Sequence, residues 1–282
     1  MSVITVGNFD GVHLGHRLLL ETVRKKALEK GEKSIAVTFD RHPRKGTPLL
    51  CSPAEKERKI LGLGIDEVVF LPFEKIENFD GEDFLEYLKS KFGLSYFVCG
   101  SDFRFGKNAA CDVDFLREKS EKFGFGLSVI AFDPKTKTSS SVIRKLLAEG
   151  DTSGAEKLLG YRYSVSAKIV SGKHIGRLLG YPTVNIFPEE NILLPRYGVY
   201  ATDIILDGER FRGITNVGVR PTFNDGDRAN AETFVLGATL SKEYSEATVV
   251  FGKFIRPEKK FASEKALSAQ IAKDVKTASE IK

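Results

Sequence analysis

The stretch GNFDGVHLGHR, residues 7–17, joins two segments of different character. The run before it, SVITVG (residues 2–7), is short and apolar, and the run after it, RLLLETV (residues 17–23), has apolar residues at helical spacing. A strand followed at once by a helix is the repeating unit of a parallel α/β sheet. We therefore expect this stretch to form the first strand-to-helix turn of such a sheet, where open α/β folds bind ligands.

The residue types in this turn suit an anionic ligand. The following helix would offer free backbone N–H groups and a partial positive charge at its N-terminus. Gly7 and Gly11 would let the backbone approach a nucleotide closely, while His13 and His16 would share a helix face and reach one phosphate group. Histidines at this spacing are also common as structural residues, and the H-E-x-x-H pattern of zinc proteases is absent. The turn alone favours phosphate binding and leaves the histidine roles open.

The composition indicates a globular protein of about two domains. The chain has 282 residues, of which 41% are hydrophobic and 29% charged. Its formal net charge of +5 is spread along the sequence, which suits small anionic ligands such as nucleotides. We do not expect a nucleic-acid partner, because no dense basic stripe with interleaved aromatic residues is present.

Cysteine spacing and hydropathy favour a cytoplasmic protein. Cys51, Cys99 and Cys111 are odd in number and lack C-x-x-C spacing, so neither a disulfide framework nor a zinc site is indicated. No apolar run approaches the roughly 20 residues that would span a bilayer. A basic leader followed by an apolar segment is also lacking, so neither a membrane partner nor a secretory signal is expected.

The first half of the chain alternates strand-like and helical segments. The strand-like runs are residues 2–7, 34–40, 66–73, 96–100 and 126–133, and the helical segments include 17–31, one that begins at Ser52, 80–93 and 141–150. This alternation predicts an α/β domain over residues 1–150, with a parallel sheet covered on both faces.

The second half has a different rhythm. The strand-like runs are residues 162–170, 197–206, 210–219, 231–240 and 247–255. With few helical patterns between them, they predict an antiparallel barrel or sandwich over residues 163–282. Residues 263–282 have apolar residues every fourth position and predict a terminal helix laid against it. The intervening residues 151–162 are expected to be a linker.

Four motifs of the first half occur in the order of a known family. HLGH at 13–16 resembles the (H/T)xGH signature of nucleotidyltransferases, and three further motifs follow: FDRHPR at 39–44, GSDFRFGKNA at 100–109 and SSSVIR at 139–144. Together they resemble the adenylyltransferase domain of the bifunctional riboflavin kinase/FMN adenylyltransferases, the bacterial FAD synthetases. The resemblance implies a Rossmann-like nucleotidyltransferase domain.

This resemblance implies adenylyl transfer, in which the phosphate of FMN attacks the α-phosphorus of ATP and pyrophosphate leaves. His13 and His16 would then be catalytic and contact the α-phosphate and the departing pyrophosphate. The resemblance assigns nucleotide binding to Gly7, Asn8, Phe9, Gly11, Ser139, Ser140 and Arg144, and flavin binding to Asp102 and Phe103. Two positions depart from the family pattern, with Arg41 in place of proline and Val142 in place of arginine.

The second half resembles the riboflavin kinase domain of the same family. The motifs are GKHIGRLLGYPTVNIF at 172–187, ITNVGVRPTF at 214–223, AETFVL at 231–236 and FIRPEKKF at 254–261. The implied fold is an antiparallel β-barrel with a terminal helix, which agrees with the strand rhythm.

The implied roles in this domain are those of a flavin kinase. Gly172, Gly176, Gly180 and Pro182 would bind ATP, Thr183 and Asn185 would bind Mg²⁺, Glu232 would be the catalytic base, and Arg256 would contact the flavin. Hydroxyl and amide oxygens are hard ligands suited to Mg²⁺. Phe234 and Gly237 depart from the usual histidine and aspartate.

The resemblance therefore implies conversion of riboflavin to FMN and of FMN to FAD, with ATP as co-substrate in both steps. A riboflavin kinase with a weak or inactive adenylyltransferase domain is an alternative. A flavin or nucleotide sensor without turnover is another, and so is transfer of CMP to a different phosphorylated acceptor. The sequence leaves open the oligomeric state, the relative rates, the domain orientation and any channelling of FMN.

Overall fold

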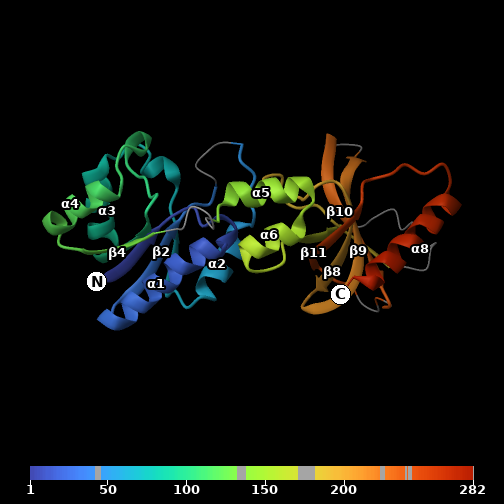
Figure 1. Ribbon diagram of the computed structural model, residues 1–282, viewed down its shortest axis with the longest axis horizontal. Coiled ribbons are helices and arrows are strands. Elements are labelled where there is room, and N and C mark those ends of the chain that lie inside the picture. Colours follow the sequence, from blue (N-terminus) through green and yellow to red (C-terminus); the bar gives the residue numbers. More distant parts are fainter. Residues whose placement is uncertain are drawn as a thin grey trace. The chain divides into compact units, whose positions relative to one another are not determined.

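The computed structural model describes residues 1–41, 46–131, 138–170, 182–222, 226–238, 240 and 243–281 (Figure 1). The chain forms two compact units, Met1–Ser140 and Ser141–Lys282. This division falls before the expected boundary at residue 150. The segment expected as a linker contains helix α6 (Thr152–Leu159), in which Ala155 and Leu159 are fully buried.

The first unit is built on a five-stranded parallel sheet in the order β3-β2-β1-β4-β5. The strands are β1 (Ser2–Val6), β2 (Lys33–Thr38), β3 (Glu67–Phe70), β4 (Leu94–Gly100) and β5 (Gly126–Ile130). Each expected strand of the first half is one of these, so the predicted parallel sheet is confirmed. Strands β2 and β4 flank β1, so the strand order reverses there and the carboxyl end of β1 lies at a topological switch point.

Helices cover both faces of this sheet. They are α1 (Leu14–Lys30), α2 (Pro53–Leu61), α3 (Gly81–Phe92) and α4 (Val113–Phe123). Helix α5 (Ser140–Glu149) begins at the boundary between the two units. Apolar residues of α1 and α2 form one buried cluster with the sheet, and those of α3 and α4 form another. Helix α4 was not expected from the sequence. Short 3₁₀ turns occur at η1 (Asp10–Val12), η2 (Phe73–Lys75) and η3 (Lys107–Ala109).

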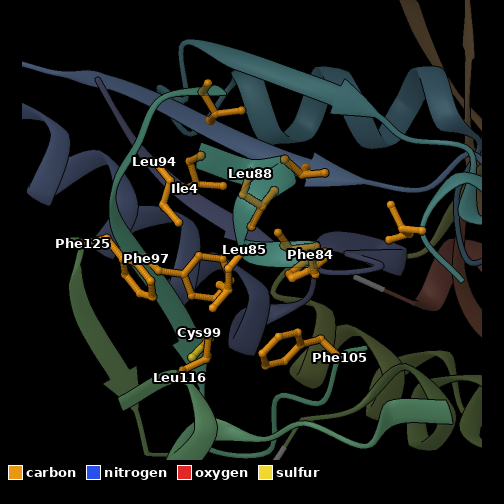
Figure 2. Close-up of a cluster of buried hydrophobic side chains, with 14 of the residues drawn as sticks. Ile4, Phe84, Leu85, Leu88, Leu94, Phe97, Cys99, Phe105, Leu116 and Phe125 are labelled. Carbon is orange, nitrogen blue, oxygen red and sulfur yellow. The ribbon is translucent and has the colours of Figure 1, made fainter. Parts of the chain in front are cut away.

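The cluster under α3 and α4 forms the larger core of this unit. Figure 2 shows Leu85 and Leu88 of α3 converging on Phe97 and Cys99 of β4, with Leu116 of α4 beside them. Leu85, Leu88, Phe97 and Leu116 are fully buried. Burial of such side chains contributes about 1.5–3 kcal/mol each, so this cluster is a main source of the unit's stability.

Local sequence signals set several helix ends. Helix α1 ends at Gly31, whose φ of 63° is left-handed, as expected. Ser52, where the sequence predicted a helix to begin, caps α2 by accepting a hydrogen bond from the Glu55 amide. Asp80 and Asp83 form a reciprocal capping box at α3.

The second unit is a closed antiparallel barrel in the order β10-β7-β6-β11-β8-β9. Its strands are β6 (Ser164–Val170), β7 (Thr183–Ile186), β8 (Gly198–Leu206), β9 (Glu209–Thr222), β10 (Gly226–Leu236) and β11 (Glu246–Arg256). The barrel prediction is confirmed over the sandwich. The barrel closes where β9 pairs with β10 along the whole length of β10, so neither of these two strands is left with an unpaired edge there.

The barrel interior is polar at its centre. The hydroxyls of Thr202, Thr215 and Thr233 form a chain with 2.8 Å between neighbouring oxygens, and all three residues are buried. Because side chains alternate along a strand, the neighbours of Thr233 in β10 face the outside of the barrel. Glu232 and Phe234 therefore lie on the outer face.

Helix α8 (Glu264–Glu280) confirms the predicted terminal helix. It packs on the outside of the barrel against β8, β9 and β11, which Figure 1 shows. Ala278 is buried in a cluster with Val199, Ala201 and Ile214. Among the described residues, no helix is both long enough and apolar enough to cross a membrane.

Candidate active sites

The turn between β1 and α1 (residues 7–13) is strained. Phe9, Gly11 and Val12 all have positive φ angles, of 45°, 76° and 39°. Such angles cost little for glycine but of order 1–3 kcal/mol for other residues, and β-branched valine rarely adopts them. Strain of this kind persists only where the surrounding fold enforces it, and it concentrates at functional sites. The turn joins β1 to α1, as the sequence predicted, and the strand order places it at the switch point of the sheet.

His13 and His16 lie ring against ring at the start of α1. Their ring centroids are 3.6 Å apart with an interplanar angle of 15°. His13 is the N-cap of α1, and its Nδ1 accepts a hydrogen bond from the His16 amide at 3.3 Å. A neutral imidazole that accepts at Nδ1 carries its proton on Nε2. His13 therefore presents an Nε2–H donor beside the free amides of the helix N-terminus.

Both histidines are neutral at pH 7. Burial lowers the pKa of His13 from 6.5 to about 4. Burial is also the main reason that the pKa of His16 lies well below its ordinary value, and the charges of His13 and Lys56 lower it further. The pair can therefore donate hydrogen bonds to a phosphate without adding charge of its own. The positive potential in this region must come from the helix terminus and from nearby cations.

The predicted nucleotide-binding residues of the turn have specific neighbours. A Cβ at Gly7 would lie 3.0 Å from the Phe9 ring, so Gly7 is needed for Phe9 to fold back over the strand. The Phe9 ring packs edge-on against His16 at 5.3 Å. Asn8 Oδ1 is buried and has no hydrogen-bond partner within the described part of the chain, which leaves an acceptor suited to a ligand.

Two buried charged residues that the sequence did not single out lie beside the turn. Asp10 is fully buried, and its Oδ1 accepts a hydrogen bond from the Leu50 amide at 2.8 Å. Lys56 of α2 is also fully buried, and its Nζ donates to the Phe39 carbonyl at 2.8 Å. Asp10 stands inside the quoted motif and could have been noticed. Lys56 lies in the charge-rich AEKERK segment, where no pattern separates it from exposed lysines.

The other predicted residues of the first half lie at carboxyl ends of strands or at the start of α5. Asp102 and Phe103 follow β4, the neighbour of β1, and Phe103 stacks on Phe105 at 5.5 Å. Ser140 begins α5, and its hydroxyl donates to the Asp10 carbonyl at 3.0 Å, which joins it to the β1–α1 turn. Ser139 directly precedes α5, and Arg144 follows one turn into it.

The two departures in this half are on the surface. Arg41, in the position of the family proline, is exposed and forms an ion pair with Glu74 at 3.1 Å. Val142 in α5 is 45% exposed. His42 and the rest of the FDRHPR motif through residue 44 lie outside the described residues.

In the barrel, strand register brings three predicted residues together. Glu232 of β10 pairs with Asn185 of β7, and Phe234 pairs with Thr183. Residues directly opposite in an antiparallel pair have Cβ atoms about 4.5–5.5 Å apart on the same face. Thr183, Asn185 and Glu232, here called the strand cluster, therefore share one outer face of the barrel. Phe234, where the family has histidine, lies on the same face.

Two oxygens of the strand cluster are buried and unsatisfied. Thr183 Oγ1 and Asn185 Oδ1 have no hydrogen-bond partner within the described residues, and Asn185 is 2% exposed. A buried oxygen without a partner costs about 1–3 kcal/mol, so such a pair indicates a ligand. Both are hard neutral oxygens, which suits a hard divalent cation such as Mg²⁺.

Residues near the strand cluster complete this face. On the side of Glu232 away from Asn185, its neighbour is Asn216 of β9. The Asn216 amide donates a hydrogen bond to Glu258 at 3.4 Å. A Cβ at Gly218 would collide with the Glu258 carboxylate. Pro182 extends the β7–β10 ladder, because its carbonyl accepts from the Val235 amide at 2.9 Å.

The remaining predictions for the barrel have different outcomes. Arg256 contacts α8, where its guanidinium forms a bidentate pair with Asp274 at 2.8 to 3.0 Å. Gly237, in place of the family aspartate, has a φ of 66°, which favours glycine. Gly172, Gly176 and Gly180 lie outside the described residues.

The fold and the two clusters define a class of two-unit proteins, in which an α/β unit with an HxGH turn precedes a closed antiparallel barrel. Family models agree with this division. "FAD synthetase" matches residues 1–143, and "Riboflavin kinase" matches residues 159–282.

Comparisons over the whole chain extend these matches. The bifunctional riboflavin kinase/FMN adenylyltransferase of Pseudomonas fluorescens is 32% identical, covering 98% of this chain and 91% of that protein. That of Escherichia coli strain K12 is 33% identical over 99% of this chain and 92% of that protein. The chain belongs to the bifunctional riboflavin kinase/FMN adenylyltransferase family. A crystal structure described as a macrolide-efflux protein from Streptococcus pneumoniae has the same fold, with a TM-score of 0.89, 27% identity and coverage of 100% of this chain and 94% of that one.

Proposed function

We propose that this protein makes FAD from riboflavin in two ATP-dependent steps. The barrel unit phosphorylates riboflavin to FMN, and the α/β unit transfers the adenylyl group of ATP to FMN with release of pyrophosphate. The observation that carries the proposal is the agreement between family and fold. Each family match falls on one architecture, and each architecture holds one polar cluster with buried, unsatisfied atoms.

In the α/β unit, the chemistry requires positioning more than covalent help. An oxygen of the FMN phosphate attacks the α-phosphorus of ATP as the bond to the bridging oxygen of pyrophosphate breaks. The His13 Nε2–H and the amides at the start of α1 hydrogen-bond the α-phosphate and the departing pyrophosphate. His16 lies against His13 and holds its ring. Ser139, Ser140 and Arg144 bind the β- and γ-phosphates, as the family motif implies.

The rest of this site receives the two substrates. Asn8 Oδ1 is a buried acceptor for an N–H or O–H group of the nucleotide. Gly7, Phe9 and Gly11 shape the turn around that nucleotide. Asp102 and Phe103 lie at the end of the neighbouring strand and contact the flavin of FMN, whose flat ring suits an aromatic surface.

In the barrel unit, Glu232 accepts the proton of the terminal riboflavin hydroxyl as that oxygen attacks the γ-phosphorus of ATP. Thr183 and Asn185 would hold Mg²⁺ through the unsatisfied oxygens of the strand cluster. When bound, the cation would neutralise charge on the ATP phosphates. Gly172, Gly176, Gly180 and Pro182 belong to the ATP-binding segment, and Arg256 to the flavin side of the site. We place the domain boundary near residue 150 and the protein in the cytoplasm, where its three free cysteines stay reduced.

Purified protein with riboflavin, ATP and Mg²⁺, sampled over time and resolved by chromatography, tests the proposal. FMN should rise first and then give way to FAD, and chelation of the metal should stop the first step. A product that stopped at FMN would contradict the adenylyltransferase assignment. Unchanged riboflavin would contradict the kinase assignment.

A matched pair of variants tests the metal ligands separately. Asn185→Leu keeps the size of the side chain but removes the oxygen, and it should raise the Mg²⁺ concentration needed for half-maximal FMN formation by about tenfold or more. Asn230→Leu, a buried asparagine of β10, is the control for the loss of an amide from the barrel. An equal effect of both variants would remove Asn185 from the metal site.

A further inference from the structure

Lys56 is the largest fully buried charged side chain in the described structure. Its ammonium donates to the Phe39 carbonyl at 2.8 Å and to Thr38 Oγ1 at 3.4 Å. Within the described residues, no carboxylate forms an ion pair with it. Burial lowers its pKa, while Cys51, Asp10 and Asp40 raise it. A buried cation held mainly by neutral oxygens is costly for stability, so stability alone does not explain its presence.

The direction of the hydrogen bonds links Lys56 to the β1–α1 turn. An ammonium group has donors only, so Thr38 Oγ1 accepts from Lys56. Its own proton then points to the Asn8 carbonyl, 3.0 Å away. The turn is also joined to β2 through the Gly7 amide, which donates to the Val37 carbonyl at 3.1 Å. Lys56 therefore anchors the backbone at Asn8 through one hydroxyl of β2.

The charge of Lys56 also acts on His16. The pKa of His16 is lowered by burial, by His13 and by the positive charge of Lys56. The titratable groups that act on His16 are His13, on the same helical turn, and Lys56 of α2. Asp10 and Cys51, in adjoining segments, raise the pKa of Lys56. A fixed positive charge at the floor of a buried site favours an anion at the site without having to be reorganised when the reaction occurs.

We propose that Lys56 is a positioning residue for adenylyl transfer: its buried ammonium holds the Asn8 carbonyl through Thr38 and supplies fixed positive charge beneath the phosphates at His13 and His16. This inference rests on the proposed function of the α/β unit. It adds a residue that lies outside the recognised motifs and touches neither substrate directly.

The test replaces Lys56 with methionine, which has a similar shape and no charge. In the full-length protein with FMN, ATP and Mg²⁺, K56M should lower kcat/KM for FAD formation about 100-fold, with both a lower kcat and a higher KM for ATP. Riboflavin phosphorylation by the same molecule should stay within about twofold, since it uses the other unit. Lys59→Met, three residues along the same helix, is the matched control and should leave both rates unchanged.

A second readout separates positioning from a purely structural role. In K56M, the pKa of His16, followed by NMR of labelled histidine, should rise, because the charge that disfavours its protonation is gone. The acid limb of the pH profile for FAD formation should move upward with it. Thermal stability should stay the same or increase, since a buried charge has been removed.

A third variant covers the case in which K56M does not fold. Thr38→Val removes the linking hydroxyl but keeps the charge, and it should lower FAD formation about tenfold without raising the pKa of His16. FAD formation by K56M or Thr38→Val within threefold of wild type would overturn the inference. So would a loss explained wholly by lower stability with an unchanged pKa of His16.

Failure of the proposed function is distinguishable from failure of this inference. Wild-type protein that formed no FAD would contradict the proposed function by itself. The role of Lys56 is then decided by the ATP affinity of the α/β unit, measured by calorimetry on wild type and K56M with the Lys59→Met control. Tenfold weaker binding in K56M alone would support the role, and equal affinities would overturn it.

Discussion

The β1–α1 turn and the strand cluster both gather polar groups, but they do so by different means. In the turn, three positive φ angles within four residues precede two neutral histidines at a helix N-terminus, and the buried Lys56 is joined to the turn through Thr38. In the barrel, regular strand pairing places Thr183 and Asn185 on the same face as Glu232, and two oxygens are left without partners.

The difference shows how each site relates to its phosphate ligand. The turn is preorganised, with its donors and its charge in place before any ligand arrives. The strand cluster offers neutral oxygens and a carboxylate, so in the proposed function it meets the anionic ligand through a cation. Changes at the two sites should therefore differ in which reaction they affect and in how they depend on pH.

Glu232→Gln should have the largest effect. FMN formation should fall by about 10³-fold or more, because an amide cannot accept the proton of the attacking hydroxyl. FAD formation from supplied FMN should be unchanged, since it belongs to the other unit. Both rates can be followed by chromatography, with Glu246→Gln on β11 as the exposed control. A parallel loss of both activities would show that the two sites are not separate.

His16→Ala should produce the reverse pattern with a somewhat smaller effect. FAD formation should fall by about 10²-fold, because the ring that holds His13 is lost. Riboflavin phosphorylation should continue, so FMN should accumulate in the time course. Leu18→Ala, an exposed position on the same helix, is the control. FAD formation at the wild-type rate would remove the histidine pair from the site.

Acid should destabilise the α/β unit before the barrel. The pKa of His13 is about 4 in the folded state against 6.5 for an ordinary histidine, so the unfolded chain binds more protons between these values. Stability from this group is complete above pH 6.5 and is lost as the pH falls toward 4, by about 3 kcal/mol in total. His16, whose pKa is also lowered, adds to the same trend.

Hydrogen exchange followed by mass spectrometry at pH 7 and pH 5 measures this loss of stability in each unit separately. Protection of peptides from β1, α1 and β4 should decrease more than that of peptides from β8, β9 and β11. His13→Gln is the matched variant, in which the difference between the two pH values should shrink. Equal changes in both units, or a larger change in the barrel, would contradict neutral buried histidines.

The smallest expected effects are those of helix caps, one in each unit. Asp80→Ala removes the capping box of α3, and Ser263→Ala removes the N-cap of α8. Each should lower the free energy of unfolding of its own unit by about 1 kcal/mol without changing either rate. Urea unfolding followed by peptide-resolved exchange provides the measurement. A rate change in either variant would tie that helix to a site.

Much of the first site could be predicted from the sequence because it is local. The GNFDGVHLGHR stretch contains the turn and both histidines within eleven residues, so its spacing indicated the strand-to-helix turn and the shared face of the histidines. The left-handed backbone of Phe9 and Val12 and the cap at His13 came from the structure. The strands of the sheet were equally clear, because buried parallel strands are short apolar runs. Helix α4 was missed, although Asp112 caps it in the usual way, since its apolar residues are few.

The second site depended on tertiary structure in a different way. Thr183 and Asn185 are two residues apart, which is the spacing of one strand face, but nothing local links them to Glu232, almost fifty residues later. Only the register of β7 with β10 makes Asn185 and Glu232 neighbours. Arg256 illustrates the same limit, since the sequence did not indicate its bidentate contact with Asp274 of α8.

The sequence by itself determined the two architectures, their order and the chemical class of each site, because hydrophobic period, turn residues and motif order are local properties. Tertiary structure alone decided which charges are buried and what they face. Lys56 and Lys59 look alike in AEKERK, yet one is fully buried behind the β1–α1 turn and the other pairs with Glu55 near the surface. Burial depends on the packing of α2 against η1 and β3, and burial is what turns an ordinary lysine into a fixed charge acting on His16.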